Sequence, residues 1–411
     1  MTILFFIKKN YKQFILIFLL LITLVYVTNI MFIPNSLILF ENEKLNIKSI
    51  WGMKLEETVE VGANVSKSTV NNSQTKSYNL SLFGFDLKAI KTNIFPTTKV
   101  IPVGNLVGLK LYTEGVLVVG VSEIKGEDNK IYKPYEEAGI EQGDSIIEIN
   151  NVEVNSTEEL MSCVSKGRGK TIDVTYIKDG NVLETQITPV KTPEHTYKLG
   201  LWVRDSEAGI GTVTFYDRET NSFAALGHGI QDIDTEELVE ISSGEFVTAT
   251  ILDIEKGIKE KPGRIEGTIE DGTKIGAIYS NTDFGVYGTT TNTAGLEVSN
   301  IEEIEVASRN EIEIGKATVI CTLEDNKREE YEIEIQKIYI NNNENNKSMV
   351  VKVTDETLLE KTGGIIQGMS GSPIIQNGKL IGSLTHVLVS DPTKGYALFA
   401  DIMASKLRNI E

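Results

Sequence analysis

The sequence contains little cysteine and little histidine. Its 411 residues include two cysteines, Cys163 and Cys321, and three histidines, His195, His228 and His386. The cysteines are far apart, so no disulfide framework can be read from them and packing must stabilise the fold. Neither residue type shows the spacing of metal ligands, and we expect neither a metal nor another cofactor.

The chain also lacks clusters of lysine and arginine. Its formal net charge is -18 and its isoelectric point is about 4.8. A surface that binds nucleic-acid phosphates needs clustered basic side chains. Nucleic acid is therefore excluded as a partner. The length allows two or three domains, each with a core of its own.

Charge is absent from residues 14–33, and Lys8, Lys9 and Lys12 precede this run. About 20 apolar residues in a helix are long enough to cross a membrane. The positive-inside rule then places residues 1–13 in the cytoplasm and the bulk of the chain on the other side. A cleaved signal peptide is the alternative, but its apolar core is usually shorter and a small-residue cleavage site should follow. We expect a single-pass anchor.

Helical periodicity is scarce beyond this run. Residues 34–99 are polar with one alternating stretch, which predicts a stalk with a small β module. Residues 197–411 consist of short alternating runs divided by turn residues, with no convincing helix before the C-terminal "LFADIMASKLRNI". This spacing favours an antiparallel sandwich or barrel, and the segment is long enough for a double β-barrel. The predicted fold class is mainly β.

Residues 100–192 contain tight turns, strands, one helix and a hairpin in a distinctive order. The stretch "AGIEQGDSIIEIN" contains two tight turns and a strand, and a capped helix and a hairpin at Asp179-Gly180 follow. The order resembles the PDZ family, in which a loop presents backbone N–H groups to the carboxylate of a peptide that adds as a strand. The residues that match this loop are Val107, Gly108, Leu109 and Lys110.

Three histidines make the search for a catalytic base short. A serine nucleophile needs a base, a group that orients the base, and donors for the oxyanion. His228 lies in "ALGHG", where two glycines let the backbone turn sharply and let the ring face a cleft. His195 stands beside a polar, proline-containing stretch and is interpreted as a linker residue, and His386 is expected to pack or to edge the cleft. His228 is the candidate base.

The candidate nucleophile lies in "GMSGSP". Gly368 permits a tight turn in which its N–H and that of Ser370 point at one spot and form an oxyanion hole. The pattern is similar to the nucleophile loop of chymotrypsin-like peptidases. Ser372 is the rival, but Pro373 follows it directly, and a turn built from small residues without chemistry is the other alternative.

The acid that would orient His228 cannot be chosen from spacing. Three aspartates qualify by their place in the chain. They are Asp283, Asp325 and Asp355.

The order of motifs over nearly the whole chain resembles one family. An apolar N-terminal run, a PDZ pattern, "ALGHG" and "VTDETLLEKTGGIIQGMSGSPIIQNGK" follow one another as in the SpoIVB peptidases, the stage IV sporulation proteins B of spore-forming bacteria. The resemblance implies a chymotrypsin-like serine peptidase whose catalytic triad falls on His228, Asp355 and Ser370.

The resemblance also implies a biological setting. Members of the family are made in the forespore, exported to the space between forespore and mother cell, and released from the membrane by self-cleavage. They then cut a regulator of an intramembrane protease, so that pro-sigma-K is processed. Their PDZ domain is implicated in self-recognition and in substrate targeting.

Two other classes of function stay open at this point. One is a membrane-tethered PDZ adaptor whose second domain is inactive. The other is a peptidase with a Ser–Lys dyad, in which Lys361 or Lys379 serves as the base, because a desolvated lysine can do that work.

Overall fold

The computed structural model divides the chain into two compact units, one before and one after Thr98, with a few residues of the late chain assigned to the first. The residues that the structure describes are 2–33, 36–40, 53–58, 74–95, 97–290, 292–324, 327–340 and 346–409.

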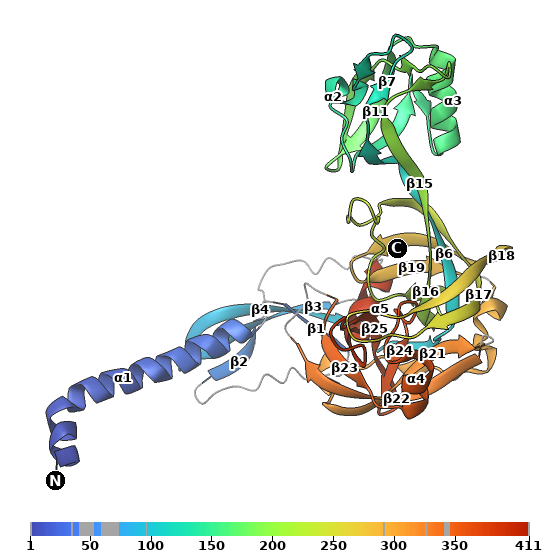
Figure 1. The fold of residues 1–411 in the computed structure, drawn as a ribbon. Coiled ribbons are helices and arrows are strands. Elements are labelled where there is room, and N and C mark those ends of the chain that lie inside the picture. The colour runs from blue at the N-terminus through green and yellow to red at the C-terminus, as the bar shows by residue number, and fades with distance from the viewer. Residues whose placement is uncertain are drawn as a thin grey trace. The chain divides into compact units, whose positions relative to one another are not determined.

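The first unit consists of a long helix and a small sheet (Figure 1). Strand β1 is parallel to β4, and the other neighbours in the order β1-β4-β3-β2 are antiparallel. Buried Leu80 and Ile90 form its small core together with Tyr26 and Ile30 of the helix. The bounds are α1 Thr2–Phe32, β1 Ser36–Phe40, β2 Met53–Thr58, β3 Gln74–Leu82 and β4 Phe85–Phe95.

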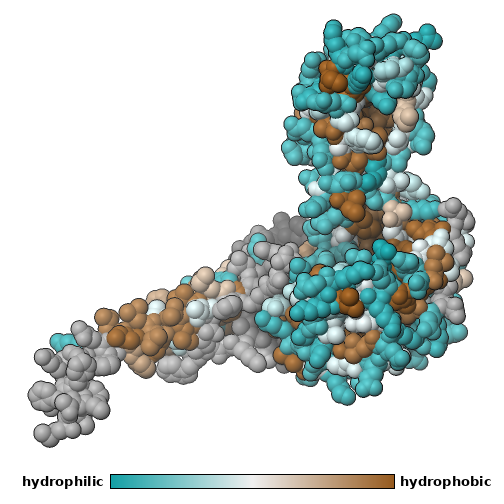
Figure 2. Space-filling view, in the orientation of Figure 1, coloured by the Kyte–Doolittle hydropathy of each residue, from teal (hydrophilic) through white to brown (hydrophobic). Residues whose placement is uncertain are grey.

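The predicted anchor, residues 14–33, lies almost entirely within α1. Large apolar side chains of this helix are exposed, among them Phe18 at 63% and Leu20 at 62%, and they form the brown band along the helix in Figure 2. Within the part of the chain that the structure describes, no helix is long and apolar enough to cross a membrane. The predicted membrane span is therefore not confirmed.

The second unit contains a ring of six strands that closes on itself. Each strand pairs with the next in the order β6-β17-β18-β19-β16-β15, and β15 pairs again with β6. Its core is packed with alternating apolar side chains such as Leu109, Phe223 and Phe246. The bounds are β6 Leu106–Val121, β15 Leu201–Asp217, β16 Ser222–Ala225, β17 Ile241–Glu255, β18 Arg264–Thr282 and β19 Gly285–Thr289, and the short strands β5 Lys99–Pro102 and β20 Ile304–Glu305 extend the sheet beyond β15.

A PDZ-type module is inserted into this ring between β6 and β15. The C-terminal half of β6 and the N-terminal half of β15 extend out of the ring into the module and pair with each other there, beginning at Val121 and Leu201 (Figure 1). Within the module, β9 also pairs with β6. Its own core includes Val116, Ile146 and Leu160. The bounds are β7 Ile124–Lys125, β8 Ile131–Tyr132, α2 Pro134–Ala138, β9 Ser145–Ile149, β10 Val152–Glu153, α3 Thr157–Gly167, β11 Ile172–Lys178, β12 Asn181–Ile187, β13 Val190–Lys191 and β14 Tyr197–Lys198.

The C-terminal strands form a second closed barrel in the order β21-β22-β23-β26-β25-β24. Helix α5 packs against β25 of this barrel and against β16 of the first ring. The prediction of a mainly β chain is confirmed. The bounds are β21 Gly315–Glu324, β22 Lys327–Ile338, β23 Met349–Val353, α4 Glu356–Thr362, β24 Pro373–Gln376, β25 Lys379–Val387, β26 Lys394–Phe399 and α5 Ala400–Asn409, with 3₁₀ turns at Thr293–Leu296, Val298–Asn300 and Arg309–Glu311.

The predicted carboxylate-binding loop, Val107 to Lys110, requires a correction. These four residues are not a loop: they form the inner half of β6, between β15 and β17 in the first ring. Leu109 is 1% exposed. A strand with a partner on each side has no free backbone donors to offer a peptide. The error arose because the apolar alternation of β6 runs unbroken from the ring into the PDZ-type module.

Candidate active site

The two barrels of the second unit line a common cleft of about 750 Å³. His228, Gly368 and Ser370, all predicted from the sequence, line it together. His228 follows β16 of the first ring, whereas Gly368 and Ser370 precede β24 of the second barrel. The structure therefore brings together the predicted base, nucleophile and oxyanion donors across more than 140 residues of chain.

The turn that carries Ser370 depends on glycine. Gly368 has φ of +99° and Gly371 has φ of +103°, which are strained for any residue with a Cβ. A Cβ on Gly371 would lie 1.8 Å from the carbonyl oxygen of Thr212. The small residues of "GMSGSP" are therefore required by the close approach of the first ring.

Two backbone donors of this turn are free. Gly368 and Ser370 line the cleft, and their N–H groups donate to no other described residue. The side-chain hydroxyl of Ser370 donates to the carbonyl oxygen of Thr385 at 2.7 Å. In the described arrangement the hydroxyl is thus directed at the backbone of β25. It must rotate before it can donate a hydrogen bond to a catalytic base.

His228 carries its hydrogen on the nitrogen that suits a general base. Its Nδ1 lies 2.8 Å from the carbonyl oxygen of Gly229. A carbonyl oxygen only accepts, so Nδ1 is the protonated nitrogen and Nε2 is left as the acceptor. Burial lowers the pKa of His228, and the hydrogen bond to Gly229 opposes that shift. The ring is therefore neutral at pH 7.

Thr212 of β15 holds the two loops together. Its N–H donates to the carbonyl oxygen of Ser370 at 2.9 Å, and its own carbonyl oxygen accepts from the N–H of Leu226 at 3.2 Å. Its hydroxyl donates to the carbonyl oxygen of Gly368 at 2.8 Å. Nothing in the sequence marks this threonine, because it lies in an ordinary alternating strand. Its contacts with the two loops form only in the folded protein, where β15 of the first ring packs against the turn of Ser370.

His386 edges the cleft, as predicted. Its ring centroid lies 5.0 Å from that of His228, with the planes tilted by 40°. Its Nδ1 is buried and has no hydrogen-bond partner among the described residues. Burial, together with the nearby His228 and Lys347, lowers the pKa of His386 to about 4. Two adjacent neutral imidazoles thus face the cleft at pH 7.

The three candidate acids differ in their position relative to the cleft. Asp355 is the N-cap of α4: its carboxylate accepts from the N–H of Leu358 at 3.0 Å and of Glu332 at 3.3 Å, and it does not line the cleft. Asp325 lies outside the described residues. Asp283 lies in the turn between β18 and β19 and lines the cleft. The assignment of Asp355 from the family resemblance stays a prediction.

The lysines of the alternative dyad are engaged elsewhere. Lys361 lies 3.1 Å from Glu329 and 3.3 Å from Glu324. Burial alone would lower the pKa of Lys361, but hydrogen bonds to Glu329 and Tyr331 raise it well above its usual value. A hydrogen bond to Glu311 likewise raises the pKa of Lys379. Neither lysine lines the cleft, and a base needs the opposite shift.

The remaining candidates are structural. Ser372 is fully buried and its hydroxyl oxygen has no hydrogen-bond partner among the described residues. His195 is exposed and lies 3.1 Å from Glu127 of the PDZ-type module. Neither residue lines the cleft.

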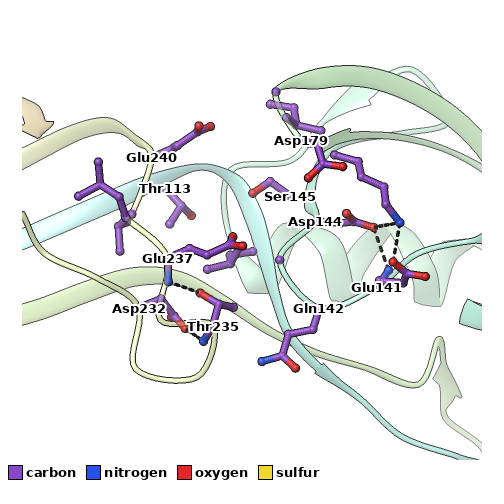
Figure 3. A pocket seen from close by; sticks show the side chains of 17 residues that line it. Thr113, Glu141, Gln142, Asp144, Ser145, Asp179, Asp232, Thr235, Glu237 and Glu240 are labelled. Atoms are coloured by element: carbon purple, nitrogen blue, oxygen red, sulfur yellow. Dashed lines mark hydrogen bonds and ion pairs between the residues drawn. The ribbon is translucent and has the colours of Figure 1, made fainter. Parts of the chain in front are cut away.

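A second, smaller pocket of about 250 Å³ lies between the PDZ-type module and the loop 232–240 (Figure 3). It is lined by carboxylates and holds no histidine. Burial raises the pKa of Asp144, whose carboxylate accepts from the N–H of Glu141 at 2.8 Å. Among the described residues, no group of three or more His, Cys, Asp or Glu side chains could hold a metal ion. The carboxylates of this pocket are Glu141, Asp144, Asp179, Asp232, Glu237 and Glu240.

Comparison with known proteins gives two family matches. The SpoIVB peptidase S55 family matches residues 195–404, which is half of the chain. The PDZ domain family matches residues 107–188. The first match contains His228, Asp283, Asp355 and Ser370.

Individual relatives cover less of the chain. Eighty-three residues are 37% identical to the zinc metalloprotease RasP of Shouchella clausii, over 20% of this chain and 19% of that protein. The PDZ domain of the SdrC-like protein Lmo2051 from Listeria monocytogenes is 21% identical, with a TM-score of 0.19 over 22% of this chain and 87% of that one. The Rv3671c protease from M. tuberculosis, in its active form, is 13% identical, with a TM-score of 0.31 over 50% of this chain and 74% of that one.

Proposed function

The chain belongs to the SpoIVB peptidase S55 family and is a PDZ-containing serine peptidase, and from this premise we propose that Ser370 and His228 form its catalytic pair. The observation that carries the proposal is the common cleft in which a neutral His228 and the turn of Ser370 meet. Thr212 bonds to the backbone of both loops and keeps them in register.

The proposed mechanism begins with rotation of the Ser370 hydroxyl away from Thr385. The Oγ atom attacks the carbonyl carbon of a peptide bond, and its proton passes to Nε2 of His228. His228 then returns the proton to the leaving amine as the C–N bond breaks. Water repeats the same sequence on the acyl-enzyme and releases Ser370.

The N–H groups of Gly368 and Ser370 are the proposed oxyanion donors. Both are free in the described structure and both line the cleft. A donor that faces the charge that develops on the carbonyl oxygen typically lowers the barrier by about 3 kcal/mol. The two glycines at positive φ support this assignment, because they permit the tight turn that carries both donors.

For the PDZ-type module we propose a peptide site in the groove between α3 and β15, in place of the one predicted on Val107 to Lys110. The groove measures about 600 Å³ and its apolar lining includes Leu160, Val164 and Trp202. The stretch Leu201–Arg204 pairs only with β6 among the described residues, so its other edge is open to an added strand. The occupant would be a segment of a protein substrate or of a second copy.

The biological role rests on the family alone. We propose that the enzyme acts in sporulation signalling: it cleaves itself and then cuts a regulator of an intramembrane protease, which leads to the processing of pro-sigma-K. Support comes from the match of the family over residues 195–404.

We further propose that the enzyme works outside the cytoplasm, at the forespore membrane, and is released after self-cleavage. Support comes from the uncharged run of residues 14–33, the lysines before it and the exposed apolar side chains of α1. Fractionation of cells that express the whole chain tests this: the protein should sediment with membranes, and its protease-accessible part should lie on the outer side.

Self-cleavage is the direct test of the proposed function. The whole chain, Ser370→Ala, His228→Ala and Lys361→Ala would be expressed, and their N-termini sequenced over time. Wild type and Lys361→Ala should be processed, and the other two should stay intact. Processing of Ser370→Ala at the wild-type rate would contradict the proposal, and loss in Lys361→Ala alone would favour the dyad.

A further inference from the structure

The loop of His228 and the turn of Asp283 leave the same end of one strand pair. β16 and β19 are antiparallel neighbours, with Ala225 opposite Val286 (Figure 1). His228 comes three residues after Ala225, and Asp283 comes three residues before Val286. The register therefore places both residues at the cleft end of the pair.

Side-chain contacts fix the two segments against each other. The side chain of Asn281 accepts from the N–H of Ile230 at 2.9 Å and donates to the carbonyl oxygens of Ile230 and Val239 at 2.8 and 3.0 Å. A Cβ on Gly229 would lie 2.7 Å from the carbonyl oxygen of Thr282. The backbone that directly follows His228 is thus held against the residues that precede Asp283.

Asp283 is also the carboxylate in the cleft that is free to act. Two carboxylates line the cleft, Glu207 and Asp283. Glu207 lies 2.8 Å from Arg204 and beside Asp232. The carboxylate of Asp283 is exposed and makes no hydrogen bond or ion pair with a described residue. By contrast, both oxygens of Asp355 accept from backbone N–H groups of the second barrel.

We propose that Asp283, and not Asp355, is the positioning residue that orients His228. In the reactive arrangement its carboxylate takes the Nδ1–H hydrogen bond that the carbonyl oxygen of Gly229 accepts in the described structure. Nδ1 keeps its hydrogen throughout, Nε2 receives the proton of Ser370, and the carboxylate stays ionised and stabilises the imidazolium. This inference rests on the proposed function of Ser370 and His228.

The exchange involves the turn that carries Asp283 and the ring of His228. The β18–β19 turn spans Asp283 and Phe284 between the two strands, and the ring of His228 must turn away from Gly229. Substrate that enters the cleft would exclude water and strengthen the pairing of the carboxylate with the imidazolium.

The test uses a fluorophosphonate probe, which reacts with an activated serine and needs no knowledge of the natural substrate. The second-order rate of labelling would be measured on the whole chain for wild type, Asp283→Asn, Asp283→Glu and Asp355→Asn. The matched control is Asp253→Asn, an exposed aspartate of β17 that does not line the cleft. Thermal unfolding would be recorded for each variant to verify folding.

Asp283→Asn should label about 10³- to 10⁴-fold more slowly than wild type while it unfolds at the same temperature. Asp283→Glu should recover part of the rate, since the charge is kept. A purely structural role would not give this rescue.

The pH profile of labelling supplies a second readout. The charged and titratable groups of the cleft are Glu207, Asp283, Lys347 and His386. Removal of the negative charge at Asp283 destabilises the protonated form of His228. In Asp283→Asn, the pH below which the remaining labelling rate falls should therefore be lower than in wild type. A structural defect would lower the rate without changing this pH.

Two results would overturn the inference in different ways. If Asp283→Asn labels at the wild-type rate and Asp355→Asn does not, Asp355 is the orienting acid and the proposed function stands. If wild type itself takes no label at Ser370, the proposed function fails together with the inference.

Discussion

The two sides of the cleft are built in different ways. The side of Ser370 is one continuous stretch between Asp355 and Pro373, which contains α4, four glycines at positive φ and the nucleophile. The side of His228 is assembled from two segments about 50 residues apart, joined by the β16–β19 pair and the side chain of Asn281. A site built from one continuous stretch can be recognised as a sequence motif. A site assembled from distant segments can be recognised only once the fold is known.

Gly371→Ala should give the largest loss, on the continuous side. The new Cβ meets backbone atoms of Thr212 and the residue sits at φ of +103°, so we expect a cost of about 2–5 kcal/mol in the free energy of unfolding. Gly378→Ala is the matched control: its φ is +76° and its Cβ would meet no atom within 4 Å, so about 1 kcal/mol is expected. Urea unfolding of both variants checks this, and equal losses would contradict the close contact between the barrels.

Asn281→Ala removes the side chain that joins the two segments on the side of His228. Three hydrogen bonds to the segment around His228 are lost, at about 1 kcal/mol each, so we expect a loss of about 2–3 kcal/mol in stability. Labelling of Ser370 should also slow about 10- to 100-fold, because His228 is less well held.

The control for this variant is Asn181→Ala, whose side chain donates one hydrogen bond in an exposed hairpin of the PDZ-type module. It should be nearly neutral in both measurements. An Asn281→Ala protein that is destabilised yet labels at the wild-type rate would show that Asn281 supports the fold but not His228.

The neighbouring histidines make the cleft sensitive to acid. The pKa of His386 is about 4 in the folded protein and near 6.5 in the unfolded chain. The unfolded chain therefore takes up the proton first, and the free energy of unfolding should fall as the pH drops from about 6.5 toward 4. In His386→Phe this fall should be smaller. Denaturation midpoints at pH 7 and pH 4.5 measure it, and an unchanged pH dependence would rule out His386 as the source.

Asp355→Ala should have the smallest effect of this series on stability. Loss of the N-cap of α4 costs about 1 kcal/mol, and Asp355→Asn, which can still cap, should cost less. Thermal unfolding of the two variants measures the difference. If Asn is as damaging as Ala, the carboxylate charge matters beyond capping.

Short motifs in the sequence pointed to residues that the structure brings together in one cleft. "GMSGSP" identified Gly368 and Ser370, and "ALGHG" identified His228, because glycines at special backbone positions are visible in a single sequence. The mainly β class and the PDZ domain followed from alternation and turn residues. Nothing in the sequence marks that β6 and β15 each run from the ring into the PDZ-type module, because the apolar alternation continues through both.

The assembled side could not be predicted in the same way. Thr212, Asn281 and Thr385 contact the catalytic loops only after distant strands pair, and nothing in their neighbours distinguishes them. Spacing left Asp283 among three candidates, and the family resemblance favoured Asp355 instead. The choice between it and Asp355 depends on the register of β16 with β19 and on the backbone donors that occupy Asp355.

The most direct test of the catalytic pair is the site at which a fluorophosphonate labels the protein, determined by peptide mass spectrometry in wild type and in His228→Ala. We expect label on Ser370, none on Ser372, and loss of labelling in His228→Ala. Label on Ser372, or undiminished label on Ser370 without His228, would contradict the proposed pair.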